Sequence, residues 1–113
     1  MVTCTNVGTT YDNNTNSSSL PVGYLDFTGV TQLLVWVRVN KIGTGTQSWQ
    51  LWNVTDSAEI AVFNDAAGAG LKDLEQTVTV ALAGVKKLRM RTKSTVAADD
   101  PVFVAWDIKP VMP

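Results

Sequence analysis

The sequence has 113 residues, a formal net charge of -1, one cysteine and no histidine. This length suits a single domain, and the small net charge gives no overall attraction to nucleic acid or to an anionic membrane. One cysteine cannot form an intrachain disulfide framework, and without histidine the usual general base and transition-metal ligand are missing. No apolar run is long enough to span a membrane, and no secretory signal is expected. We therefore expect no enzyme, no cofactor and no membrane partner.

Residues 1–20 are polar, and Thr9–Ser19 consists mostly of Asn, Ser and Thr. Such a segment buries too little apolar surface to offset the entropy cost of ordering it. We expect residues 1–20 to form a flexible N-terminal arm, which is either a frayed end or a strap that orders against a partner. Val2–Val7 could add a short edge strand. Residues 21–113 are expected to form the folded domain.

The strongest strand signal is Leu33–Asn40, whose odd positions are all apolar and mostly β-branched. One face of this strand is therefore predicted to lie in the core. Other short apolar or alternating segments have turn residues between them. In chain order the expected strands are Tyr24–Phe27, Leu33–Asn40, Ser48–Asn53, Ala58–Val62, Leu74–Leu82, Lys86–Lys93 and Val102–Lys109. Seven or eight strands without a convincing helix predict an all-β fold, an antiparallel β-sandwich of the jelly-roll kind.

Two pairings follow from matching the apolar faces of neighbouring strands. Pairing Leu33–Asn40 with Ser48–Asn53 gathers Leu34, Trp36 and Trp52 on one outer face. A contiguous patch with two tryptophans is typical of a partner interface, although another part of the same subunit could cover it.

The second pairing concerns Leu74–Leu82 and Lys86–Lys93. If these strands form an antiparallel hairpin, matching their faces predicts an odd-length loop, 83–85, with Gly84 at positive φ. In the last strand the inward residues are expected to be Val102, Val104, Trp106 and Ile108.

A basic stripe lies on one face of the strand Lys86–Lys93, with Leu88 and Met90 on the other face. Its members are Lys87, Arg89, Arg91 and Lys93. These cations could meet phosphate or an acidic protein surface. A nucleic-acid site would ideally interleave aromatic residues with the cations, and this strand has none, so we favour a solvated outer face and expect no nucleic-acid partner.

Two further features were weighed for chemistry. Asp99 and Asp100 form the only adjacent acidic pair, which could serve glycoside hydrolysis or a weak Ca²⁺ site, but such a pair before proline is ordinary turn composition. No catalytic or metal residue is therefore assigned. Four tryptophans suggest sugar binding, and only Trp36 and Trp52 are out of phase with the expected core.

The segments Lys41–Asn53 and Lys93–Phe103 resemble parts of small β-sandwich virion proteins of tailed bacteriophages, the accessory class that decorates or cements capsids. The resemblance covers roughly Tyr24 to Lys109. It implies a non-enzymatic, homo-oligomeric protein of the virion exterior, with the major capsid protein or other virion proteins as partners. The alternative is a carbohydrate-binding module on a phage tail or fibre that uses Trp36 and Trp52.

Overall fold

The computed structural model describes residues 2–3, 11, 20–96 and 101–112. The expectations for Asp99 and Asp100, and most of those for the N-terminal arm, lie outside these residues. Leu20 is 1% exposed and belongs to the core, so packing of the domain includes this residue. The described residues form no helix, and hence no helix long and apolar enough to cross a membrane.

Eight strands make up the described fold. They are β1 (Val2–Thr3), β2 (Val22–Asp26), β3 (Gln32–Lys41), β4 (Gln47–Asn53), β5 (Ala58–Asp65), β6 (Gly70–Thr79), β7 (Val85–Ser94) and β8 (Val102–Val111).

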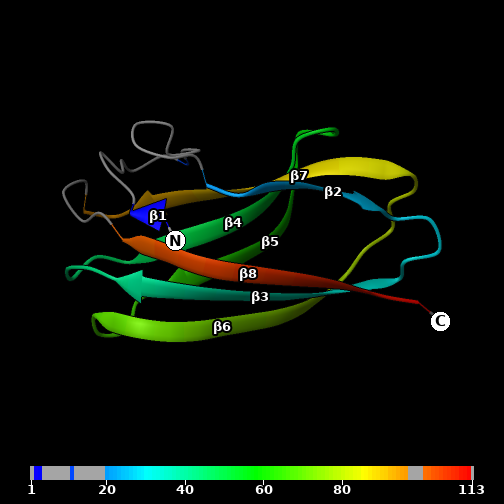
Figure 1. Ribbon diagram of the computed structural model, residues 1–113. Helices are drawn as coiled ribbons and strands as arrows, with labels where there is room; N and C mark the ends of the chain where they lie inside the picture. The colour runs from blue at the N-terminus through cyan, green and yellow to red at the C-terminus, as the bar shows by residue number, and fades with distance from the viewer. Residues whose placement is uncertain (1, 4–10, 12–19, 97–100, 113) are drawn as a thin grey trace.

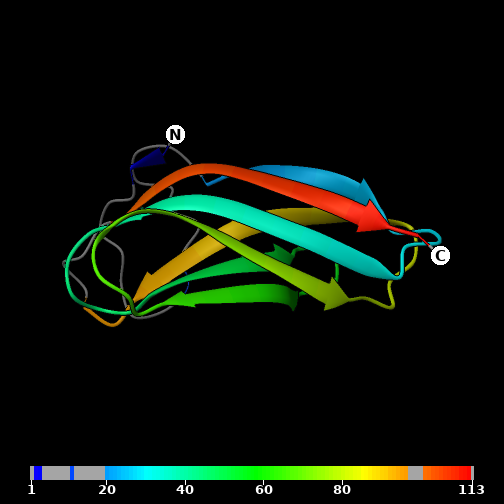
Figure 2. The ribbon, with the colours of Figure 1, turned by 90° about the horizontal axis from the view of Figure 1, so that it is seen from below.

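Two four-stranded sheets stack face to face, as Figures 1 and 2 show. One has the order β1-β8-β3-β6 and the other β2-β7-β4-β5, and all neighbours are antiparallel. The chain passes from one sheet to the other at every connection except β4–β5. This arrangement is the double-sheet jelly roll, so the predicted fold class is confirmed.

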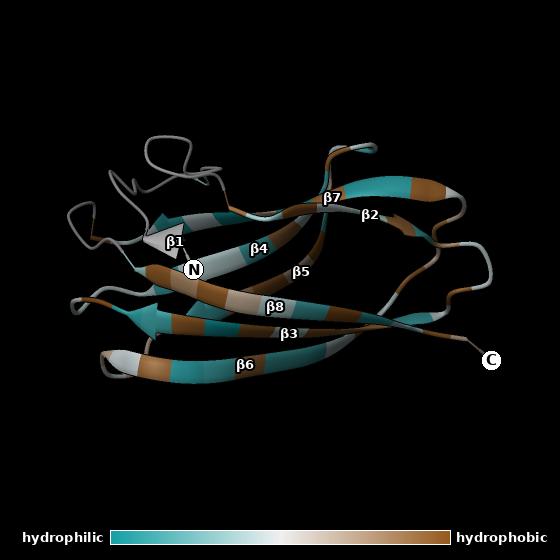
Figure 3. Cartoon of the chain, in the orientation of Figure 1, coloured by the Kyte–Doolittle hydropathy of each residue, from teal (hydrophilic) through white to brown (hydrophobic). Residues whose placement is uncertain are grey.

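The core lies between the sheets and contains the predicted face of β3. Leu33, Val35, Val37 and Val39 are each 0% exposed, and Figure 3 shows apolar and polar bands alternating along this strand. The other sheet contributes Trp49 and Leu51 from β4 and Leu88 and Met90 from β7. Trp49 also packs against Phe103 of β8 with ring centroids 5.6 Å apart.

The predicted pairing of β3 with β4 is wrong. β3 lies between β6 and β8, whereas β4 lies between β5 and β7. A strand with alternating apolar residues must turn its apolar face to the core. Two such strands can do this as neighbours in one sheet or from opposite sheets across the core. The pattern therefore identified the buried faces without identifying the neighbours.

The same limit applies to β6 and β7, which were expected to form a hairpin. They lie in different sheets, so the predicted pairing is wrong and residues 80–84 cross between the sheets. Gly84 has φ of 77°, but the hairpin loop for which a positive φ was predicted does not form, so that prediction is not tested.

A β-bulge in β8 changes which residues of this strand face inward. The β3–β8 register shifts at Val104, which is the extra residue of the bulge. Trp106 and Ile108 pack against the core as expected. Phe103, which is 3% exposed, takes the inward place that the sequence pattern assigned to Val102 and Val104. An even alternation cannot anticipate such an inserted residue.

The turn after β4 is held by a carboxylate. Asp56 accepts hydrogen bonds from Asn53 Nδ2 at 2.8 Å and from Lys86 Nζ at 2.9 Å. The backbone N–H of Asp56 donates to Asn53 Oδ1 at 3.1 Å. The hydrogen bond from Lys86, followed by that from Asn53, lowers the pKa of Asp56 below its usual 3.8.

This turn predicts a pH-dependent contribution to stability. A carboxylate whose pKa is lowered by folding stabilises the protein above its unfolded pKa, and this contribution is lost as the pH falls through the folded pKa. Asp56→Asn should therefore lower the thermal midpoint at neutral pH, and the difference from wild type should shrink from about pH 5 to about pH 2. Lys86→Met should behave alike. A gap that stays constant with pH in thermal denaturation would contradict this assignment.

Candidate functional site

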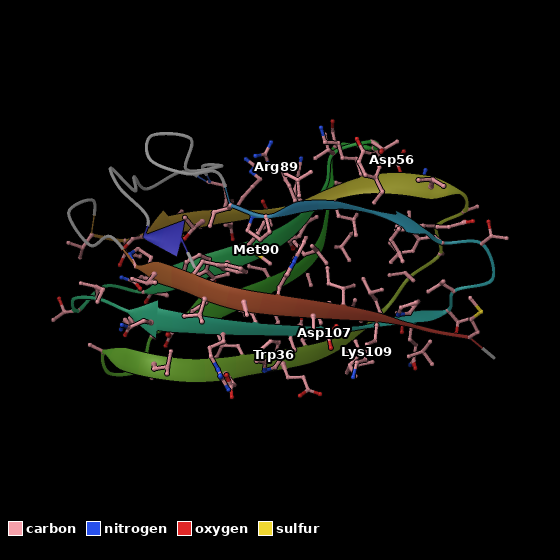
Figure 4. The ribbon with its side chains drawn as sticks, viewed as in Figure 1. Trp36, Asp56, Arg89, Met90, Asp107 and Lys109 are labelled. Atoms are coloured by element: carbon pink, nitrogen blue, oxygen red, sulfur yellow. The ribbon has the colours of Figure 1, made fainter. Side chains whose placement is uncertain are left out.

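The three residues expected to form one interface patch lie on opposite faces of the sandwich. Leu34 and Trp36 belong to the outer face of the β1-β8-β3-β6 sheet, and Trp52 to the outer face of the β2-β7-β4-β5 sheet. Figure 4 likewise shows Trp36 and Arg89 on opposite sides, with Met90 between the sheets. The predicted patch is therefore wrong, because β3 and β4 are not neighbours.

Leu34 and Trp36 instead line a groove on the surface of their own sheet. Its volume is about 390 Å³, and the other lining residues are Glu75 of β6 and Asp107 and Lys109 of β8. Figure 4 shows Trp36, Asp107 and Lys109 gathered on this side of the molecule. All five side chains project from strands of one sheet, so the backbone hydrogen bonds of the sheet fix their spacing.

The strand register places Trp36 between two carboxylates. Trp36 lies opposite Glu75 on one side and opposite Asp107 on the other. Since neighbouring strands are about 4.8 Å apart, the backbones of Glu75 and Asp107 are separated by about 10 Å with the indole between them. Lys109 lies opposite Leu34 and its Nζ is 3.5 Å from an oxygen of Asp107.

A charged pair, Arg38 and Asp73, packs against the indole of Trp36. The guanidinium carbon of Arg38 lies over the indole, 5.5 Å from the ring centroid. Arg38 donates from Nε and Nη2 to the two oxygens of Asp73, at 2.7 and 3.1 Å. This hydrogen-bonded pair lowers the pKa of Asp73 and raises the pKa of Arg38. The pair thus orders a cation against Trp36.

These groups offer three kinds of contact. A partly buried indole presents a flat apolar surface, the two carboxylates accept hydrogen bonds, and Lys109 donates them. Among the residues that the structure describes, no three His, Cys, Asp or Glu side chains cluster closely enough to hold a metal ion. The groove therefore provides for binding by stacking and hydrogen bonding.

The basic stripe occupies the outer face of the other sheet. Lys87, Arg89, Arg91 and Lys93 alternate along β7 with Leu88 and Met90, which are 2% and 0% exposed. The sequence analysis missed the aromatic residues beside the stripe. The Cζ atom of Arg91 lies 4.5 Å from the ring centroid of Trp52 and 5.6 Å from that of Tyr11.

Both aromatic residues come from outside β7, so the sequence of this strand carries no sign of them. Trp52 lies opposite Arg89 in the β4–β7 pairing and would have been found had that pairing been assigned. Tyr11 lies far away in sequence. Its burial raises the pKa of its phenol, Glu59 adds to the rise, and a hydrogen bond with Ser48 and the charge of Arg91 oppose it.

No protein family and no curated protein matches this sequence. Solved structures match by fold. A family 6 carbohydrate-binding module of the Cellvibrio mixtus lichenase 5A, solved with cellotriose, is 14% identical, covers 94% of this chain and 89% of its own, and has a TM-score of 0.54. The C-terminal domain of EclA, described as a sugar-binding protein, is 16% identical over 96% of this chain and 74% of its own, with a TM-score of 0.55.

A family 4 carbohydrate-binding module is 9% identical and has a TM-score of 0.56. The match covers 80% of this chain, which spans 59% of the length of that structure. Identities this low are evidence of a common fold alone. The chain thus has a β-sandwich fold that is also found in carbohydrate-binding modules.

Proposed function

We propose that this protein is a non-catalytic saccharide-binding domain and that the groove around Trp36 is its binding surface. The observation that carries the proposal is the row in which Trp36 lies between Glu75 and Asp107. A sugar ring has an apolar face of C–H groups and a rim of hydroxyls. The indole suits the face, while the carboxylates suit the hydroxyls on either side of it.

The groove also meets the physical requirements of a binding site. It is concave, it combines apolar with polar groups, and its residues stand on strands whose register is fixed on both sides of β3. Arg38, which is paired with Asp73, packs over the indole of Trp36 at one side of this surface. The fold gives further support, since two of the similar structures are described as a cellotriose complex and a sugar-binding protein.

Capsid decoration, expected from the resemblance, has less support at this surface. Its interface argument depended on Leu34, Trp36 and Trp52 forming one apolar patch, and they lie on opposite faces. Partnership with the major capsid protein, homo-oligomerisation and a place on the virion exterior stay predictions of the resemblance. A saccharide-binding domain on a phage tail or fibre would agree with both lines of reasoning.

Trp36→Ala should weaken saccharide binding strongly. Truncating a tryptophan at the centre of a binding site commonly costs about 2 kcal/mol, which corresponds to roughly 30-fold in affinity. Binding would be located on an array of neutral oligosaccharides and measured by titration calorimetry. The matched control is Trp52→Ala, which removes a partly buried tryptophan from the opposite sheet. Absence of binding to every neutral saccharide by the wild type, or loss in the control alone, would refute the proposal.

The two carboxylates should contribute hydrogen bonds to the same ligand. Glu75→Gln and Asp107→Asn keep the size of each side chain and remove its charge, so each should lower affinity by roughly threefold to tenfold. Both side chains are exposed, and thermal midpoints should stay close to that of wild type. Glu59→Gln, on the opposite sheet, is the control. Unchanged affinity in both groove variants would show that hydroxyls do not contact these carboxylates.

A further inference from the structure

The basic stripe forms a line of positive charge without matching acidic partners. Side chains on one face of a strand are about 6.7 Å apart, so the four cations span about 20 Å. None of Lys87, Arg89, Arg91 and Lys93 forms an ion pair with another described residue. Since the whole chain has a net charge of -1, this face is locally cationic in a slightly acidic protein.

Arg91 is a cation of this stripe that contacts two aromatic rings. Its guanidinium lies over the rings of Trp52 and Tyr11, and the Nζ atom of Lys93 lies 4.5 Å from the centroid of Tyr11. Contacts with ring faces leave the in-plane N–H groups of a guanidinium available. Those N–H groups form a fork that binds the two oxygens of a carboxylate or sulfate together. The two rings thus hold an oxyanion donor in place.

A hydrogen-bond acceptor lies beside this donor. Gln50 is directly opposite Arg91 in the β4–β7 register and is only 5% exposed, although it belongs to the outer face. Its Nε2 donates to Glu59 at 3.0 Å, whereas its Oε1 has no partner among the described residues. A buried acceptor without a partner is costly, and a ligand hydroxyl would satisfy it once the Gln50 amide turns toward the surface.

We propose that this face is a second binding site, which takes an acidic saccharide through an oxyanion on Arg91 and a hydroxyl near Gln50. The oxyanion donor and the hydroxyl acceptor together favour a sugar that carries carboxylate or sulfate groups. The carboxylate of Glu59 beside Gln50 repels any oxyanion, so the ligand must present a neutral hydroxyl there and its oxyanion at Arg91. Internal nucleotides of single-stranded DNA have no free hydroxyl, so they match this pattern less well. The site shares no residue with the groove at Trp36 and does not depend on it.

Binding would be measured by interferometry on immobilised polygalacturonate, dextran sulfate, neutral dextran and single-stranded poly(dT). We expect the wild-type protein to bind one or both acidic polysaccharides, to lose them as salt increases, and to ignore dextran. Arg91→Gln should weaken this binding by roughly ten- to hundredfold. Arg91→Lys should also weaken it, because an ammonium keeps the charge and lacks the fork. If the Arg91 variants have a lower thermal midpoint than the wild type, Lys93→Gln serves as a second test of binding at the same face.

Four results would overturn the proposal. The first two are no binding to either acidic polysaccharide and wild-type affinity in Arg91→Lys. The third is tighter binding of poly(dT) than of both polysaccharides, which would identify a nucleic-acid site. The fourth is loss of acidic binding in Trp36→Ala, which should leave it unchanged, because that loss would place the ligand in the groove. Because the groove is tested with neutral sugars and Trp36→Ala, either site can fail while the other stands.

Discussion

The position of β3 in the middle of its sheet is the constraint on which the rest of the structure depends. Burial of Leu33, Val35, Val37 and Val39 turns one face of this strand to the core, and backbone hydrogen bonds to β6 and β8 fix it on both edges. A slip by one residue would exchange the two faces and expose the core side chains. The energetics of the core therefore dictate that Trp36 points outward between Glu75 and Asp107. The groove follows from the packing of the opposite face.

The two outer faces of the sandwich differ in charge. Neither face has to pack in the core, so its side chains can be polar or charged. On the β3 face cations and carboxylates are mixed, and Arg38 is paired with Asp73. On the β7 face the cations are in excess and contact aromatic rings instead of carboxylates. Neutral ligands with hydroxyls suit the first surface, and ligands with oxyanions suit the second. One sandwich can thus present two surfaces of different chemistry with a common core.

Much of this arrangement could be predicted from alternation alone, because successive side chains along a strand point to opposite faces. This period predicts the buried face of β3. It also predicts that Leu88 and Met90 point inward and the basic stripe outward. Neighbours could not be predicted, because jelly-roll connections put β3 and β4 in different sheets. The β8 bulge at Val104 also breaks the alternation. The groove and the aromatic surroundings of Arg91 both depend on contacts between distant segments, which is why the sequence indicated single residues and not sites.

In sites built on the outer face of a sheet, the residues that would bind a ligand differ from those that stabilise the core. Glu75, Asp107 and Lys109 are exposed and do not belong to the core, so replacing them removes no core side chain. Gln50 is different, because it is buried on an outer face and keeps an acceptor without a partner among the described residues. A group that costs stability in the free protein is retained more readily where a ligand satisfies it. Together with the cations that contact aromatic rings, this acceptor distinguishes the β7 face from a surface that is merely solvated.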